Sequence, residues 1–160
     1  MATDGKGTVL QPGERETISM PGNKVSFVHR QLDSAYSLVE WTSEPGAPGS
    51  SVHVHRMTDE AFYVLEGTFG FQLDEETVEA SAGAFVFAPK GIVHAFWNQG
   101  PSPARMVLMM SPPAFVRYLE ELAEGLAAAG DDVEAAMSLR KELSEKYDIE
   151  IVGPPRQATG

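Results

Sequence analysis

Nine short segments of β-branched, aromatic and other apolar residues constrain the fold of this chain most strongly. They lie at 25–30, 36–42, 51–57, 60–67, 68–73, 77–81, 84–89, 93–98 and 104–110. Turn-favouring sequences such as PKG and NQGPSP separate them, and no helical periodicity lies between them. Many short strands at this spacing predict an all-β domain, either an antiparallel sandwich or a barrel.

A helical pattern replaces the strand pattern after Met110. Apolar residues recur at helical spacing up to Gly130, which predicts an amphipathic helix with Ser111 as its N-cap and two prolines in its first turn. A second helix is predicted at 132–147. The sequence IEIV at 149–152 predicts a last edge strand that ends at the following Gly-Pro-Pro.

These patterns divide the chain into three parts. Residues 1–16 are polar and rich in glycine, and we expect a flexible segment there. We expect the β-domain at 17–110 and a helical extension, which packs on that domain, at 111–160. A chain of 160 residues is large enough for one such domain to bury its own hydrophobic core.

The charge balance argues against two classes of partner. The chain has 12 Lys and Arg against 23 Asp and Glu, a formal net charge of −11. Such a surface repels the phosphates of nucleic acids and of anionic lipids, so we expect no nucleic acid and no membrane as partner. No cysteine is present to form a disulfide or a thiolate ligand. Because the sequence shows no apolar secretory signal and no long apolar run, it predicts a cytoplasmic protein.

The sequence HVHRMTDE at 53–60 gathers three potential metal ligands in a chain with four histidines. His53 and His55 are two positions apart, so on a strand they would point to the same face. Glu60 begins the next predicted strand, and a hairpin would bring it opposite the two histidines. His94, which follows the PKG turn, is the candidate for a fourth ligand. For His-x-His alone, two half-buried and hydrogen-bonded histidines are the alternative interpretation.

Two stretches resemble the motifs of the cupin superfamily. HVHRMTDEAFYVLEG, at 53–67, is similar to the first motif: His-x-His, four residues, Glu, six residues and Gly. GAFVFAPKGIVHAFWN, at 83–98, is similar to the second: Gly, five residues, Pro-x-Gly, two residues, His, three residues and Asn. Ala47 departs from the pattern, since the first motif usually begins with glycine there. Gly46 and Gly49 flank it, which favours a shifted loop.

The resemblance implies a jelly-roll β-barrel, in agreement with the strand count. It also implies that a metal ion is bound by His53, His55, Glu60 and His94. Turn and support positions of the motifs match Gly67, Gly83, Pro89, Gly91 and Asn98. Small single-domain cupins of this kind resemble quercetin 2,3-dioxygenase. His29 lies outside both motifs, and we expect it to be a strand or surface histidine.

Three imidazoles and one carboxylate suit one divalent transition metal ion, namely Fe, Mn, Co, Ni or Zn. Four protein ligands leave one or two coordination positions open for a substrate, and Glu60 is then the expected catalytic base. By strand parity, the aromatic neighbours of Glu60 and His94 face the barrel interior. The expected pocket walls, which core packing explains almost equally well, are Phe62, Phe96, Met106 and Met110.

The implied partner is a small-molecule substrate. The leading hypothesis is a quercetinase-like dioxygenase that acts on an enolisable aromatic, flavonol or polyketide-type molecule. One alternative is a redox-neutral isomerase, cyclase or lyase that uses the same metal as a Lewis acid, and oxygen consumption separates the two. A non-enzymatic cupin that binds a small molecule is the third hypothesis. A homodimer is the assembly that we consider for this chain.

Overall fold

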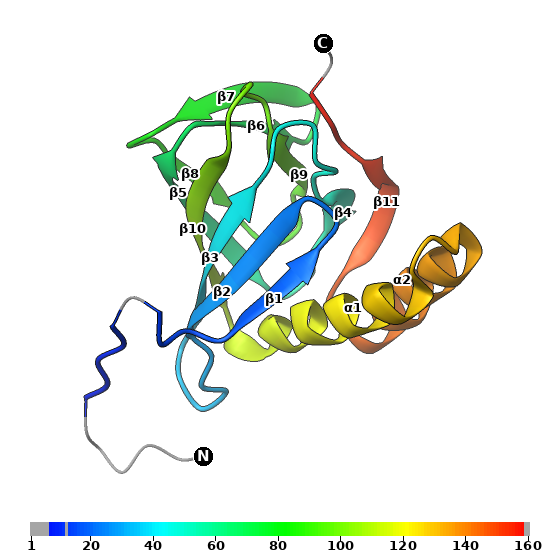
Figure 1. Cartoon of the computed structure of the whole chain (residues 1–160), viewed down its shortest axis with the longest axis horizontal. Helices are drawn as coiled ribbons and strands as arrows, with labels where there is room; N and C mark the ends of the chain where they lie inside the picture. The colour runs from blue at the N-terminus through cyan, green and yellow to red at the C-terminus, as the bar shows by residue number, and fades with distance from the viewer. Residues whose placement is uncertain (1–6, 12, 159–160) are drawn as a thin grey trace.

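The computed structural model describes residues 7–11 and 13–158, and two antiparallel β-sheets facing each other dominate it (Figure 1). The six-stranded sheet has the order β1 (Thr17–Met20), β2 (Asn23–His29), β3 (Ser37–Ser43), β10 (Ala104–Ser111), β5 (Asp59–Glu66) and β8 (Phe85–Ala88). The five-stranded sheet has the order β11 (Glu150–Pro155), β4 (Ser51–Val54), β9 (Val93–Asn98), β6 (Thr68–Leu73) and β7 (Glu76–Ser81).

Aromatic side chains from both sheets meet in the core. Phe62 of the six-stranded sheet packs on Phe71 and Phe96 of the five-stranded sheet, with ring centroids 5.1 and 5.6 Å apart. All three rings are buried. Each contributes roughly 1.5–3 kcal/mol by leaving water, so this cluster holds the two sheets together. The sheets with the two C-terminal helices confirm the predicted cupin jelly-roll.

All nine predicted strand segments contain a strand, but one pairing differs from our expectation. β4 and β5 do not form a hairpin, because they belong to different sheets. Both edges of β4 are taken, one by β9 and the other by β11. Residues 55–58 therefore carry the chain from one sheet to the other. The sequence analysis did not predict β1, which pairs with β2 at the outer edge of the six-stranded sheet.

The C-terminal extension contains two antiparallel-packed helices, α1 (Val116–Ala129) and α2 (Val133–Lys146). The predicted N-cap was wrong: Ser111 ends β10 and its hydroxyl donates to the carbonyl of Ala35. A short 3-10 helix, η1 (Pro113–Phe115), leads into α1 instead. α2 starts one residue later than predicted, and the Asp132 carboxylate caps it by accepting a hydrogen bond from the backbone N–H of Ala135.

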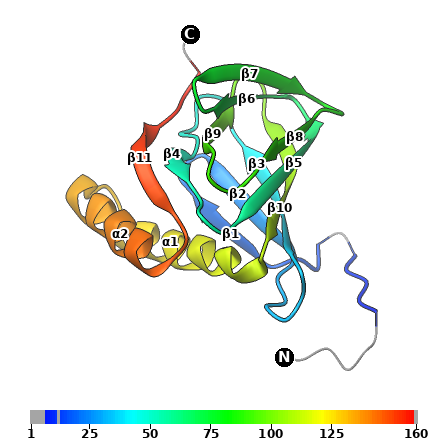
Figure 2. The same ribbon diagram turned by 180° about the vertical axis from the view of Figure 1, so that it is seen from behind.

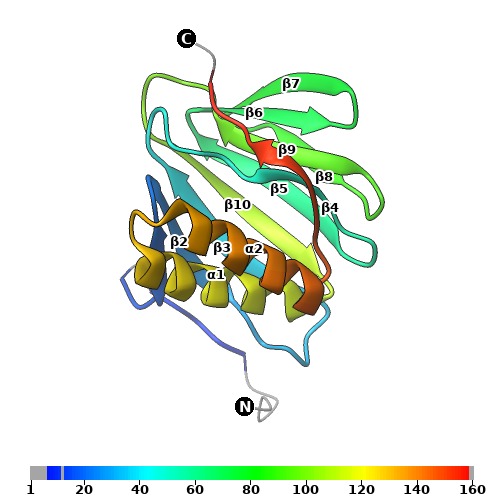
Figure 3. The same ribbon diagram turned by 90° about the vertical axis from the view of Figure 1, so that its right-hand side faces the viewer.

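The extension lies across one end of the β-barrel (Figure 2), with the two helices side by side (Figure 3). β11 then returns to the five-stranded sheet and pairs with β4. The predicted end of this strand was wrong, because β11 continues through Gly153 and Pro155 with two register shifts. Proline is tolerated there because β11 is an edge strand, where half of the backbone N–H groups need no partner in the sheet.

The predicted N-terminal segment at 1–16 falls partly outside the described residues, which exclude 1–6 and 12. Residues 7–11 and 13–16 contain neither strand nor helix, and nearly all of them are exposed. The three-part division of the chain stays a prediction. Among the described residues, no helix has the length and apolar character needed to cross a membrane.

Candidate metal centre

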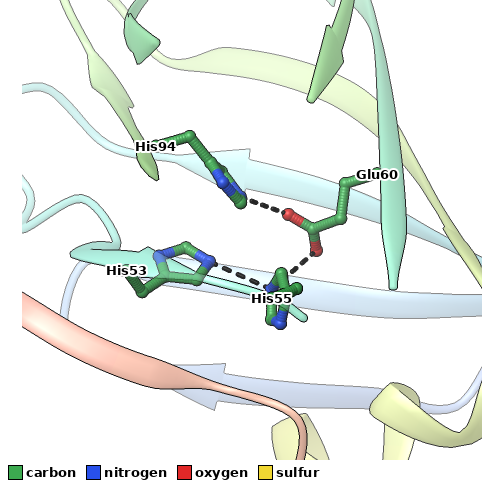
Figure 4. Close-up of side chains that lie close together, drawn as sticks. All are labelled: His53, His55, Glu60 and His94. Atoms are coloured by element: carbon green, nitrogen blue, oxygen red, sulfur yellow. Dashed lines mark hydrogen bonds and ion pairs between the residues drawn. The ribbon is translucent and has the colours of Figure 1, made fainter. Parts of the chain in front are cut away.

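Both sheets contribute to one cluster of polar side chains inside the barrel (Figure 4). His53 on β4 and His94 on β9 are directly opposite each other in the register of the five-stranded sheet. His55 follows β4, and Glu60 projects from β5 in the facing sheet. Glu60 thus reaches the histidines across the barrel interior rather than along a hairpin. The structure brings all four predicted ligands together.

The four side chains are close enough to share one ion. Their potential ligand atoms all lie within 4.8 Å of one another, and each side chain is 1–4% exposed. His94 Nε2 lies 2.7 Å from Glu60 Oε2, and His55 Nε2 lies 3.7 Å from Glu60 Oε1. His53 Nε2 lies 3.1 Å from His55 Nε2. The Nε2 atoms therefore converge on the carboxylate.

Backbone carbonyls orient the three imidazole rings. His53 Nδ1 donates to the carbonyl of Ser51 at 2.7 Å, and His94 Nδ1 to that of Ile92 at 3.2 Å. His55 Nδ1 donates to the carbonyl of Asp148. When both rings are neutral, these bonds place the proton of His53 and of His55 on Nδ1, and two Nε2 lone pairs then face each other at 3.1 Å. Two acceptors this close repel each other, and a cation between them removes the repulsion. The residues present therefore fit a metal ion.

The charge states of the cluster also suit a cation. Burial, and next the nearby His94, lower the pKa of His53 to about 3, so this imidazole is neutral at physiological pH. Burial raises the pKa of Glu60, but the hydrogen bond from His94 and the neighbouring imidazoles outweigh it and lower that pKa to about 2. Burial lowers the pKa of His94, but the hydrogen bond and charge of Glu60 raise it overall. A proton on His94 thus balances the buried carboxylate, and a bound cation would take the place of that proton.

Comparison with known proteins identifies a domain family in part of the chain. The family model described as "Cupin domain" matches residues 39–110, which include all four clustered side chains. Residues 39–110 form a cupin domain. The solved structure of KdgF from Halomonas sp. is similar to this chain at 25% identity, with a TM-score of 0.59, and the match covers 67% of this chain and 94% of KdgF. The fold similarity therefore extends beyond the matched motifs.

Two curated relatives match part of the chain by sequence. Polyketide synthase CurC of Streptomyces cyaneus is 34% identical over 97 residues, which cover 59% of this chain and 63% of CurC. The tetracenomycin polyketide synthase protein TcmJ of Streptomyces glaucescens is 36% identical over 70 residues, which cover 42% of this chain and 47% of TcmJ. The match thus spans less than two thirds of either relative. Resemblance to quercetin 2,3-dioxygenase stays a prediction.

The support positions of the second cupin motif have structural tasks. Gly83 and Gly91 both adopt a backbone φ of 90°, a conformation that other residues rarely adopt. Asn98 is fully buried, and its amide nitrogen donates to the carbonyls of Ser43 and Ser102, each at 2.9 Å. Asn98 thereby fixes the turn that follows β9, the strand that carries His94.

A largely apolar cavity of about 130 Å³ opens beside the candidate metal centre. His53, Glu60 and Phe96 line it on the barrel side, and Tyr118 and Leu122 of α1 line it on the other. Of the four predicted pocket residues, Phe96 lies on this cavity. The other three are fully buried in the core and are not among its lining residues: Phe62, Met106 and Met110.

Four functional candidates escaped the sequence analysis because they lie in the extension and follow no motif. Phe115 packs on the His55 ring, with centroids 4.4 Å apart, and stacks on Tyr118. Asp148 receives the His55 hydrogen bond. Arg140 of α2 is the one Lys or Arg side chain among the described residues that line the cavity. Within the described part of the chain, it forms no ion pair. For this region, the sequence analysis predicted helices and an edge strand but no functional residue.

Proposed function

We propose that this protein is a metal-dependent enzyme that enolises a polyketide-type substrate. The observation that carries the proposal is a complete, buried cluster of three histidines and one glutamate that opens on an apolar cavity. The polyketide synthase names of CurC and TcmJ support the substrate class. Polyketides carry carbonyl groups at alternate carbons, and the protons between two carbonyls are acidic enough for metal-assisted removal.

Each residue of the cluster has a defined task in this proposal. His53, His55 and His94 hold the ion through Nε2, while their Nδ1 atoms stay bonded to backbone carbonyls. A bound metal supplies a Lewis acid that stabilises negative charge on a substrate oxygen. Glu60 is ionised, the form required both to bind a cation and to accept the proton from the substrate carbon. The surrounding apolar walls exclude water and strengthen these electrostatic effects.

The cavity indicates which part of a substrate reaches the metal centre. An apolar cavity of about 150 Å³ holds a benzene molecule, so a cavity of about 130 Å³ is close to the size of one aromatic ring or one diketone unit. Arg140 adds a positive charge to these walls and would bind a carboxylate or phenolate group. We therefore propose an aromatic or diketone substrate that also carries an anionic group.

Dioxygenation is the reaction that we propose for the enolised substrate. Removal of a proton leaves an electron-rich carbon, which can react with O2 where a redox-active ion such as Fe, Mn, Co or Ni is bound. Redox-neutral ring closure is the second candidate. Its support is the polyketide synthase identity of the two relatives, because polyketide assembly joins carbon atoms through enolate chemistry without consuming O2.

Hydrogen–deuterium exchange on a diketone separates these possibilities. The protein, loaded in turn with each of the five candidate metals, is mixed with benzoylacetone in D2O under air and under argon. We expect catalysed exchange at the carbon between the two carbonyls in both atmospheres, seen by NMR. Dioxygenation predicts an oxygen-electrode signal and product under air alone, whereas ring closure predicts no oxygen uptake. Exchange no faster than with His94→Ala would contradict enolisation by this site.

A homodimer would use the edge strand β8. The exposed aromatic side chains Phe85 and Phe87 lie on this strand, and Phe85 is the register partner of exposed Tyr63 on β5. An unpaired edge with apolar neighbours favours association with a second copy. We propose a dimer at micromolar concentration that Phe85→Glu dissociates, measured by sedimentation velocity. A monomer at all concentrations would contradict it.

A further inference from the structure

The segment 55–58 joins the two sheets and separates two of the candidate ligands. It begins with His55, and Glu60 follows two residues after it ends. The distance between these two ligands therefore depends on how the segment is held. In a hairpin, backbone pairing between strands would hold it, but β4 and β5 belong to different sheets. Another part of the chain has to fix it in place.

Asp148 holds this segment through its carboxylate. Oδ1 accepts a hydrogen bond from the backbone N–H of Arg56 at 2.8 Å. Oδ2 accepts from the backbone N–H of Met57 at 2.9 Å and from the buried Thr58 hydroxyl at 2.7 Å. Hydrogen bonds to an ionised acceptor are about twice as strong as neutral ones, and three of them converge on this one group.

The backbone of Asp148 contacts a ligand directly. Its carbonyl accepts the Nδ1 proton of His55, which sets the tautomer and the direction of Nε2. Phe115 packs against the same ring, so two parts of the C-terminal extension orient His55. Asp148 lies between α2 and β11 and outside the matched cupin domain. One residue of the extension thus holds both the ligand and the segment that spaces it from Glu60.

We propose that Asp148 is a positioning residue of the metal centre, through which the C-terminal extension sets the geometry of metal binding. Its carboxylate fixes the crossing between the sheets, and its carbonyl orients the His55 ring. Partners of this kind typically change metal affinity 10–100-fold when they are removed. The proposal concerns metal binding, so it stands whichever reaction the enzyme catalyses.

Metal titration with Co²⁺ tests the proposal, because the visible absorption of Co²⁺ reports its coordination geometry. We expect Asp148→Asn to weaken Co²⁺ binding roughly 10-fold or more and to alter the spectrum of the bound ion. The matched control is Glu150→Gln, which removes the nearby exposed ion pair with Arg56 and leaves the three hydrogen bonds intact. We expect this control to bind Co²⁺ within twofold of the wild type and with its spectrum.

A purely structural role predicts a different result. In that case Asp148→Asn lowers the melting temperature but leaves the dissociation constant and the spectrum unchanged, and this outcome would overturn the proposal. A second pair of variants applies if Asp148→Asn does not fold. Thr58→Val removes one donor and should weaken binding several-fold, whereas Thr58→Ser keeps the hydroxyl and should restore it. Equal affinities of these two variants would also overturn the proposal.

Discussion

The cupin domain and the C-terminal extension meet at the same histidine but contribute to it differently. The domain supplies four candidate ligands from residues 53–94, at spacings short enough to form sequence motifs. The extension supplies Phe115 and Asp148, which lie 60 or more positions beyond His55 and belong to no motif. Ligand identity is therefore encoded locally, whereas ligand orientation depends on the complete fold.

The largest expected effect is the loss of a ligand within the domain. His94→Ala should weaken Zn²⁺ binding about a hundredfold or more, because four-ligand zinc sites contribute roughly 10–16 kcal/mol in total. His29→Ala is the matched control, since His29 is the histidine outside the cluster. Competition with a chelating dye measures both dissociation constants. Similar values for the two variants would show that His94 is not a ligand.

Removal of the Phe115 ring tests whether the extension is an integral part of the site. Phe115→Ala should lower the free energy of unfolding by about 3–5 kcal/mol, because the ring is buried against His55 and Tyr118. Val133→Ala on the exposed surface of α2 should change it by at most about 0.5 kcal/mol. Urea unfolding measures both. Equal small losses would mean that the extension does not pack firmly on the domain.

Protons should compete with the metal ion at His94. The pKa of His53 is about 3 and that of Glu60 about 2, so both are deprotonated at neutral pH. The pKa of His94 is raised, so below that pKa a proton must leave before metal binds. Zn²⁺ affinity should therefore fall by about tenfold per pH unit as the pH drops through the raised pKa. Isothermal titration measures it, and a constant affinity from pH 8 to pH 5 would contradict imidazole ligation.

The smallest effect is expected at Arg140, a residue of the extension that lines the cavity. Arg140→Met should weaken binding of an aromatic carboxylate such as benzoate by roughly tenfold, since a hydrogen bond to a charged group contributes about 1.5–3 kcal/mol and solvent screens part of it. Arg140→Lys should retain part of the affinity. Binding of benzyl alcohol, the neutral analogue, should not change. Equal losses for both ligands would show that Arg140 acts through packing and not through its charge.

The sequence predicted most of the strands and the four clustered side chains because both leave local patterns. Strand alternation identified the segments of the barrel, and fixed motif spacing identified His53, His55, Glu60 and His94. Strand parity also placed Phe96 in the interior, where it lines the cavity. These features depend on neighbours a few residues apart, so a sequence reveals them directly.

The remaining features depend on pairings between distant segments. The expected hairpin failed because β11, which lies about 100 residues after β4, occupies the edge that β5 would need. The N-cap role of Ser111 failed because β10 extends one residue further than its apolar run. Nothing in the spacing of Arg140 or Asp148 connects them to a site formed by residues 53–94.

Metal analysis of the purified protein by plasma mass spectrometry, beside His53→Ala, tests the central claim most directly. We predict close to one Fe, Mn, Co, Ni or Zn ion per chain in the wild type and a sharp loss of that ion in the variant. No metal in the wild type, even after incubation with each of these ions, would contradict the claim. Equal metal content in the two proteins would contradict it as well.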